Sequence, residues 1–90
     1  MNGAQEDNPN ETIRLDLRGL KCPLPALHTR RALERASAGA LITVECSDPM
    51  AAIDIPHLVA TDGHRLEAQQ VTQIPLVFVI RKRADEGRIG

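Results

Sequence analysis

Hydrophobic and polar residues alternate in two segments of the first half of the chain, with the period of two that is typical of half-buried strands. The first segment spans residues 12–17, ends before Arg18 and Gly19, and carries on one side Ile13, Leu15 and Leu17. The second spans residues 41–47 and carries on one side Ile42, Val44 and Cys46. Both segments are predicted to be strands, and the alternation places the Cys46 side chain toward the core.

Two further strands are expected in the last third of the chain. Residues 74–83 alternate, with Leu76, Phe78 and Ile80 on one face. Val77 and Val79 on the other face favour a central position in the sheet, partly covered on both sides. A weaker strand is expected at residues 64–71, and a short turn at Thr72 and Gln73 would join the two strands as an antiparallel hairpin.

Two helices separate the first three strands. Residues 23–38 contain apolar residues at helical spacing, begin with prolines that a first turn tolerates, and precede Gly39, which we expect to stop the helix. Residues 50–61 follow Asp48 and Pro49, a cap and a first-turn proline, and end before Gly63. Pro56 leaves two interpretations, a helix that restarts with a new cap at Asp54, or one turn followed by a main helix.

The predicted order is therefore β-α-β-α-β-β. Parallel crossovers would connect the first three strands, and both helices would cover one face of a mixed four-stranded sheet. The fold class is an α/β (α+β) two-layer sandwich. Because 90 residues support a single core, we expect one domain at residues 12–83, a flexible tail at 1–11 and a frayed tail at 84–90.

Composition excludes several classes of protein. No apolar run is long enough to span a membrane, and no signal peptide is recognisable, so we expect a cytoplasmic protein with no membrane contact. Phe78 is the only aromatic residue, so the chain lacks an aromatic platform for stacking on bases, and we expect no direct binding of nucleic acid. Two cysteines are too few for a disulfide framework, so either one would act as a thiol.

Cys22 lies where the first strand-to-helix loop meets the start of the helix, directly before Pro23 and Pro25. The helix N-terminus and the adjacent Lys21 would favour the thiolate, which is the nucleophilic form of cysteine. The prolines stiffen the first turn and leave no second sulfur in a Cys-x-x-Cys arrangement. The sequence thus predicts an activated, exposed thiol without a neighbouring resolving cysteine.

That arrangement discriminates among chemistries. A dithiol oxidoreductase needs a neighbouring cysteine, whereas Cys46 is expected in the core. A cysteine hydrolase needs a histidine base, and His28 would point away from the helix start. The Cys and His spacings support no metal site, and we expect no cofactor. A lone thiol is suited to accepting a group and passing it on, for example a sulfane sulfur held as a persulfide.

The segment 15–25, Leu-Asp-Leu-Arg-Gly-Leu-Lys-Cys-Pro-Leu-Pro, resembles the Leu-Asp-x-x-Gly-x-x-Cys-Pro-x-Pro motif of the TusA-like (SirA-like) sulfur-carrier family. The resemblance extends over residues 12–83 through Asp48-Pro49, Asp54-Ile55-Pro56, Gly63-His64 and Ile80-Arg81-Lys82. It implies the same two-layer fold and a persulfide on Cys22, the catalytic position. The residues expected to shape that site are Gly19, Lys21, Pro23 and Pro25.

The resemblance also implies partner proteins, since such a carrier turns over only with them. Sulfur would come from a cysteine desulfurase or a rhodanese-like donor and pass to an acceptor protein, serving tRNA thiolation, sulfur oxidation or cofactor sulfuration. Members that serve tRNA thiolation often have Glu between the two prolines, where this chain has Leu24. The pathway therefore stays open, as does the choice between sulfur and selenium.

Residues 12–38 carry six basic and two acidic side chains. This surface is either a solvated face or a docking surface for a partner, and the candidate docking residues are Arg18, Arg30, Arg31 and Arg35. A different class of function is a regulatory or RNA-interacting module in which Cys22 is incidental or a redox sensor. His64 near Cys22 is a further open possibility, whereas Asp16 and Asp54 are interpreted as turn or cap residues.

Overall fold

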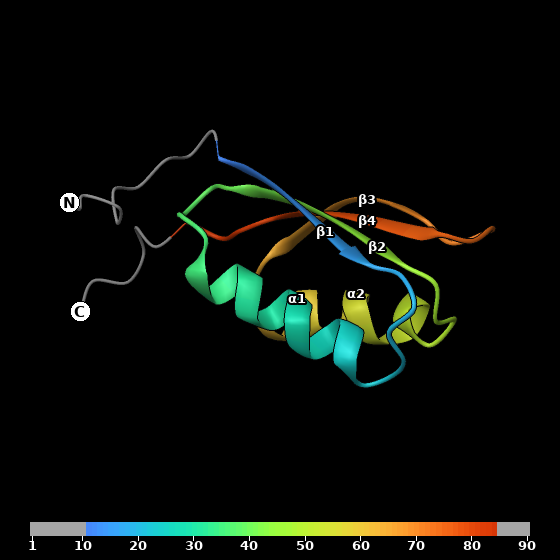
Figure 1. Ribbon diagram of the computed structural model, residues 1–90. Helices are drawn as coiled ribbons and strands as arrows, with labels where there is room; N and C mark the ends of the chain where they lie inside the picture. The colour runs from blue at the N-terminus through green and yellow to red at the C-terminus, as the bar shows by residue number, and fades with distance from the viewer. Residues whose placement is uncertain (1–10, 85–90) are drawn as a thin grey trace.

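The computed structural model describes residues 11–84 and shows two helices beneath a four-stranded sheet (Figure 1). The elements follow the order β1 (Thr12–Leu17), α1 (Leu24–Arg35), β2 (Leu41–Cys46), α2 (Ala51–Thr61), β3 (Arg65–Gln70) and β4 (Leu76–Arg81). Both helices pack on the same face of the sheet, and the other face is open (Figure 1). The predicted two-layer sandwich and its order of elements are confirmed.

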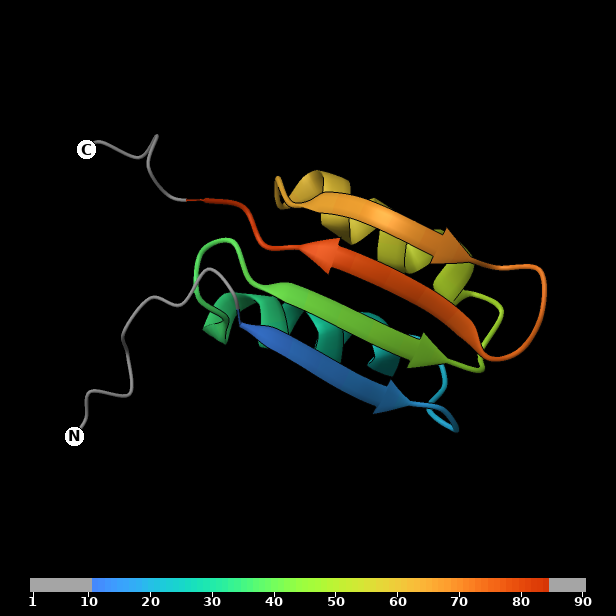
Figure 2. The ribbon, with the colours of Figure 1, turned by 90° about the horizontal axis from the view of Figure 1, so that it is seen from above.

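The strands lie in the order β1-β2-β4-β3. β1 pairs with β2 in parallel, from Thr12 opposite Leu41 to Leu17 opposite Cys46, whereas β4 is antiparallel to both β2 and β3. In Figure 2, β1, β2 and β3 run in one direction and β4 runs in the other. The mixed sheet, the antiparallel hairpin and the central position of β4 are as predicted. The second crossover leads to a strand that is not a neighbour of β2, because β4 lies between them.

The core lies between the inner face of the sheet and the helices. Alternate residues of β2 and β4 are fully buried, among them Val44, Cys46 and Phe78 at 0 % exposure. From the helices, Leu33 and Ile55 are also completely inaccessible. The burial of Cys46 confirms its predicted orientation, and removal from water raises the pKa of its thiol to about 11.

Helix α1 turns its polar face outward and buries Pro25, Thr29 and Leu33. The Thr29 hydroxyl donates to the Pro25 carbonyl oxygen at 2.8 Å, so its burial leaves no polar atom without a partner. The helix ends at Arg35, three residues before the predicted end. Gly39 therefore does not stop it. With φ of 84°, Gly39 occupies the third position of a β-turn in which the Ala40 N–H donates to the Ser37 carbonyl.

Helix α2 is a single continuous helix that contains Pro56, so neither of the two interpretations of that proline is correct. Its C-terminus is the predicted glycine stop. Gly63 has φ of 79°, and the His64 N–H reaches back to the Val59 carbonyl at 2.9 Å while the Gly63 N–H reaches Ala60 at 3.2 Å. This pair of hydrogen bonds forms a Schellman motif, which satisfies carbonyl groups that a helix end leaves unpaired.

The hairpin loop is longer than the predicted two-residue turn. β3 ends at Gln70 and β4 begins at Leu76, and the side chain of Gln70 organises the residues between them. Its Oε1 accepts from the N–H groups of Thr72 and Gln73 at 2.8 and 3.0 Å, and its Nε2 donates to the Pro75 carbonyl at 3.0 Å. These bonds take the place of main-chain pairing, which shortens both strands relative to the sequence prediction.

The predicted tails fall almost entirely on residues 1–10 and 85–90, which lie outside the described part of the chain. Glu11 is an exception, because it was placed in the N-terminal tail and instead belongs to the folded domain. Its carbonyl accepts from the Leu41 N–H at 2.9 Å, and its carboxylate accepts from the Ser37 N–H at 3.0 Å. The parallel pairing of β1 with β2 thus begins one residue earlier than the alternation of side chains indicates.

The burial of Phe78 on the central strand generates a stability prediction. Phe78→Ala should lower the free energy of unfolding by about 3–5 kcal/mol, because it leaves a cavity in the core. Since that loss can prevent folding, Phe78→Leu should be measured too and should cost about 1 kcal/mol. Urea titrations followed by circular dichroism suit a chain without Trp or Tyr. Val77→Ala, on the open face, is the control and should cost less than Phe78→Ala; equal losses would contradict this description of the core.

Candidate functional site

Cys22 is exposed and lies in the loop between β1 and α1. Two turns shape that loop. In the first, the Leu20 N–H donates to the Leu17 carbonyl at 3.2 Å. Gly19, the third residue of this turn, has φ of 89°, a left-handed conformation that glycine adopts freely. In the second, the Leu24 N–H donates to the Lys21 carbonyl at 2.8 Å. The Cys22–Pro23 peptide bond is cis. The loop carries the thiol to the surface at the start of α1, as predicted.

Asp48 ties this loop to the one that follows β2. One of its carboxylate oxygens accepts from the Cys22 backbone N–H at 2.6 Å, and the other accepts from the Met50 N–H at 3.0 Å. The hydrogen bond from Met50 has the largest effect on the Asp48 carboxyl and lowers its pKa. The hydrogen bond from Cys22 and the positive charge of Lys21 lower this pKa further. Asp48 is therefore an ionised carboxylate that both caps the approach to α2 and fixes the main chain at Cys22.

Asp54, in the first turn of α2, contacts the sulfur itself. The Cys22 thiol donates to Asp54 Oδ2, with 3.4 Å between sulfur and oxygen. This hydrogen bond, and after it partial burial and the negative charges of Asp54 and Asp48, raise the pKa of the Cys22 thiol. The expectation of a favoured thiolate is therefore wrong. In the free protein, the carboxylates beside the sulfur stabilise its protonated form.

The composition of the first turn of α1 explains why the helix start does not reverse this effect. A helix N-terminus favours an anion through N–H groups that lack a partner within the helix. Pro23 and Pro25 have no N–H, and the N–H of Leu24 is bonded to Lys21. The same prolines that make a compact helix start thus remove most of the donors that a thiolate would need.

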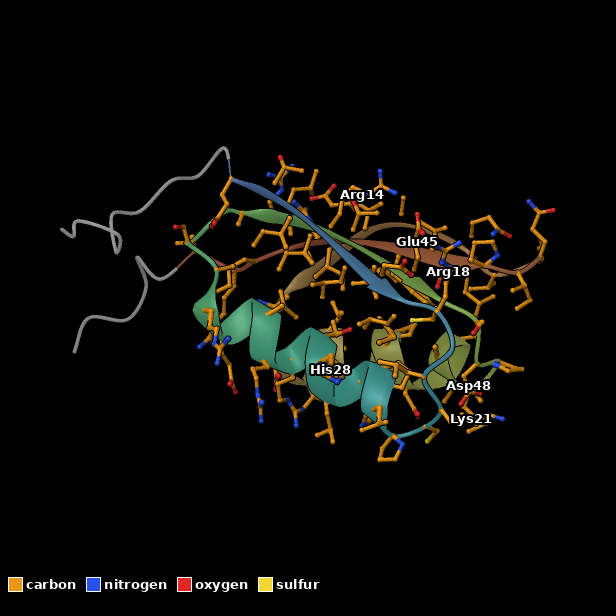
Figure 3. The ribbon with its side chains drawn as sticks, viewed as in Figure 1. Arg14, Arg18, Lys21, His28, Glu45 and Asp48 are labelled. Carbon is orange, nitrogen blue, oxygen red and sulfur yellow. The ribbon has the colours of Figure 1, made fainter. Side chains whose placement is uncertain are left out.

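The two basic residues nearest to Cys22 in sequence are engaged with carboxylates. Lys21 lies beside Asp48 at the end of the molecule where both helices begin (Figure 3). Arg18 binds Asp16 through two contacts of 2.8 and 2.9 Å and approaches Glu45 at 4.0 Å. Figure 3 places Arg18 and Glu45 together on the sheet, above the level of the helices. The positive charge in this loop is thus largely matched by neighbouring negative charge.

The other candidate docking residues lie along α1. Arg30 pairs with Asp62 at 2.9 Å, Arg31 lines a small surface hollow with Leu24 and Leu27, and Arg35 is in the last turn. The basic residues of the first third of the chain are therefore spread over the sheet, the loop and the helix rather than gathered at Cys22.

Neither His28 nor His64 contacts the thiol in the described part of the chain. His28 lies in the middle of α1 (Figure 3), as expected. His64 directly precedes β3 at the opposite end of the sheet, where its Nδ1 accepts from the Arg83 N–H at 3.0 Å. Within residues 11–84, no three His, Cys, Asp or Glu side chains are grouped so as to hold a metal ion. No helix in this range is long and apolar enough to cross a bilayer.

Asp48 and Asp54 are the residues of the site that sequence reasoning missed, since it assigned both to caps and turns. Asp48 was recognisable as a capping residue, because it precedes Pro49 and a helix, and its carboxylate accepts from the Met50 N–H; Asp54 lies inside α2 and caps no helix. Asp48 and Asp54 lie 26 and 32 residues from Cys22 along the chain, so their contacts with it are visible only in the tertiary structure. The available signal was topological, because parallel strands place the loops that follow them at one edge of the sheet.

The contact between Asp54 and the sulfur generates a prediction about thiol ionisation. Asp54→Asn removes the negative charge and should lower the pKa of the Cys22 thiol, raising alkylation by iodoacetamide at pH 7.5 by about threefold to tenfold. The pH profile of the alkylation rate measures this shift directly. Glu67→Gln, a surface carboxylate on β3 that pairs with Arg81, is the matched control and should leave the profile unchanged. An unchanged profile for Asp54→Asn would contradict the assignment, and Cys22→Ser sets the background.

Comparison with known families agrees with this geometry. The family model described as sulfurtransferase TusA matches residues 13–82, from the first strand to just beyond the last. The matched range includes the loop that carries Cys22 and both carboxylates that contact it. Together, the match over most of the chain and the two-layer fold show that this protein belongs to the TusA sulfurtransferase family and is a sulfur carrier.

Proposed function

We propose that Cys22 accepts a sulfane sulfur as a persulfide from a donor protein and relays it to an acceptor protein. The observation that carries this proposal is the exposure of a single thiol at the meeting point of the first turns of α1 and α2. The other cysteine, Cys46, is fully buried in β2. A carrier needs one accessible sulfur and no second thiol to displace its cargo as a disulfide, and these two cysteines meet that requirement.

Loading is an exchange between two sulfur atoms. After losing its proton, the Cys22 sulfur attacks the outer sulfur of the donor's persulfide and forms a new S–S bond. The donor's own S–S bond breaks, and the donor cysteine leaves as a thiolate that takes up a proton. Delivery repeats the exchange in the other direction, when an acceptor thiolate attacks the outer sulfur on Cys22 and restores the Cys22 thiol. Neither step needs an oxidant or a reductant.

The carboxylates beside the sulfur suit a carrier rather than a store of sulfur. Asp54 accepts the thiol hydrogen and so orients the S–H bond toward α2. A persulfide anion at the same position would face the negative charges of Asp48 and Asp54, which favours its transfer to an acceptor over long retention. Gly19, Lys21, Pro23 and Pro25 contribute by shaping the loop that presents the sulfur.

The raised pKa of the Cys22 thiol also separates a carrier from a redox sensor. Sensor cysteines are typically thiolates of low pKa, which react directly with peroxide. Hydrogen bonding to Asp54 has the opposite effect on Cys22 and limits its reaction with small oxidants in the free protein. This favours sulfur relay over the sensor alternative. As the source of sulfur we propose a cysteine desulfurase or a rhodanese-like protein, in a cytoplasmic route to tRNA thiolation, sulfur oxidation or cofactor sulfuration.

Sulfur loading tests the proposal. Incubation with a cysteine desulfurase and cysteine, with a rhodanese and thiosulfate, or with inorganic polysulfide should add ~32 Da per sulfur to the intact mass. Cyanide should remove the added mass as thiocyanate, which identifies a sulfane sulfur. Cys22→Ser should lose the adduct, whereas Cys46→Ser should keep it provided that the variant folds. Polysulfide needs no docking, so the absence of a Cys22-dependent adduct from all three sources would overturn the proposed function.

A further inference from the structure

The large exposed hydrophobic residues of the described chain all lie at one end of the molecule. Within residues 11–84, six large hydrophobic side chains are exposed: Leu24, Leu27, Met50, Ile53, Val71 and Ile74. They come from the first turns of α1 and α2, the residue before α2, and the hairpin loop. The loop belongs to the same end because Cys46, the last residue of β2, pairs with Leu76, the first residue of β4. We call these six residues the apolar end.

Cys22 lies within this end. Its backbone is bonded to Asp48, which precedes Met50, and its sulfur is bonded to Asp54, which follows Ile53. On the far side of α2, Val71 and Ile74 line a hollow together with Pro49 and Ala52. Ile53 is 64 % exposed and Ile74 is 58 % exposed. These exposed fractions are high for isoleucine, a residue type that is usually buried. Exposed apolar side chains that gather at the same end of a domain as a reactive atom mark an interaction surface.

The opposite end of the domain has a different character. The hollow there is lined chiefly by charged and polar side chains, including Arg30, Asp62, Lys82 and Arg83. Arg30 and Asp62 form an ion pair at 2.9 Å across the two helices. The contrast shows that the apolar end is not a general property of the surface of this small domain. Within residues 11–84, the large exposed hydrophobic side chains are confined to the end that carries the sulfur.

The charges beside Cys22 indicate which charge a partner bound to the apolar end must carry. Asp48 and Asp54 bring two carboxylates to Cys22, and Lys21 is the basic residue that acts on Asp48. A partner that covers this surface removes water from those carboxylates, which is costly unless the partner supplies a positive charge in return. The same positive charge would favour the Cys22 thiolate when the two reacting sulfur atoms meet.

From this complementarity we infer that the apolar end is the docking surface for a sulfur-relay partner whose reacting cysteine is flanked by lysine or arginine and surrounded by hydrophobic side chains. The inference rests on the proposed function of Cys22 and adds the recognition chemistry of its partner. Apolar contacts from α1, α2 and the hairpin loop hold the partner, and its cation faces Asp48 and Asp54. The free carrier then keeps its sulfur protonated, and docking activates it.

Symmetric disulfides of short peptides imitate the two required features separately. The first peptide has its cysteine flanked by lysines and then by leucines, the second replaces the lysines by glutamates, and the third replaces the leucines by serines. The Cys22 thiolate attacks one sulfur of the disulfide, the disulfide bond breaks, and one peptide thiolate leaves while the other peptide stays bound to Cys22. Intact-mass spectrometry follows this reaction, and each rate is divided by the rate of the same disulfide with 2-mercaptoethanol.

With the full-length protein at low salt, the lysine and leucine peptide should react about tenfold faster than the glutamate peptide and about threefold faster than the serine peptide. Asp48→Asn combined with Asp54→Asn should remove the advantage of lysine and keep that of leucine. Ile53→Ser combined with Leu27→Ser should do the reverse. Glu34→Gln combined with Glu67→Gln, which changes the net charge by the same two units but lies on α1 and β3 away from Cys22, should keep both advantages.

Equal normalised rates for the three peptides, or losses of preference that are the same in the control that combines Glu34→Gln with Glu67→Gln, would overturn the inference. Circular dichroism of each variant establishes that it is folded before its rates are compared. Failure of the docking surface is distinguishable from failure of the proposed function, because sulfur loading by polysulfide does not depend on docking. Loading at Cys22 without any peptide preference removes only the docking surface, whereas no loading removes the carrier itself.

Discussion

The parallel pairing of β1 with β2 is the constraint on which the site depends. Because the two strands run in the same direction and in register over six residues each, the loops that leave them emerge at one edge of the sheet. Helices α1 and α2 therefore begin side by side, on the same face (Figure 1). Cys22 from the first loop then meets Asp48 from the second and Asp54 from the first turn of α2. Antiparallel pairing would have separated these groups by the length of the sheet.

The same arrangement determines the character of the thiol. A helix start is usually an anion site, but the prolines of α1 remove its donors and the second loop supplies carboxylates instead. The result is an exposed cysteine whose surroundings favour the thiol over the thiolate. For a protein that passes sulfur between partners, such a thiol limits reaction with the small oxidants and electrophiles it meets between encounters.

The two ends of the domain differ in surface character, one carrying the large exposed hydrophobic residues and the other a hollow lined chiefly by charged and polar side chains. The large exposed hydrophobic side chains share the end that carries the sulfur, while the ion pairs of Arg30 with Asp62 and of Arg81 with Glu67 lie away from it. The buried core between sheet and helices, centred on Phe78, is independent of this division. The six residues of the apolar end are exposed and do not belong to this core.

Local patterns in the amino-acid sequence determined the elements of the fold. The alternation in β1, β2 and β4, the burial of Cys46 and the stop at Gly63 follow from side-chain period and backbone freedom, which are properties of neighbouring residues. The motif around Cys22 was also readable, because its residues are contiguous. Gly39 was misread, since a glycine with positive φ serves a β-turn as well as a helix end.

Tertiary structure alone decided the insertion of β4 between β2 and β3, the ionisation of Cys22 and the collection of apolar residues at one end. Each of these depends on groups far apart in the chain. The sulfur and its carboxylate partner at Asp54 are 32 residues apart, and no local periodicity encodes their distance. The sequence identified Cys22 as the candidate for the chemistry, and the packing of the second loop against the first set the charge that this residue experiences.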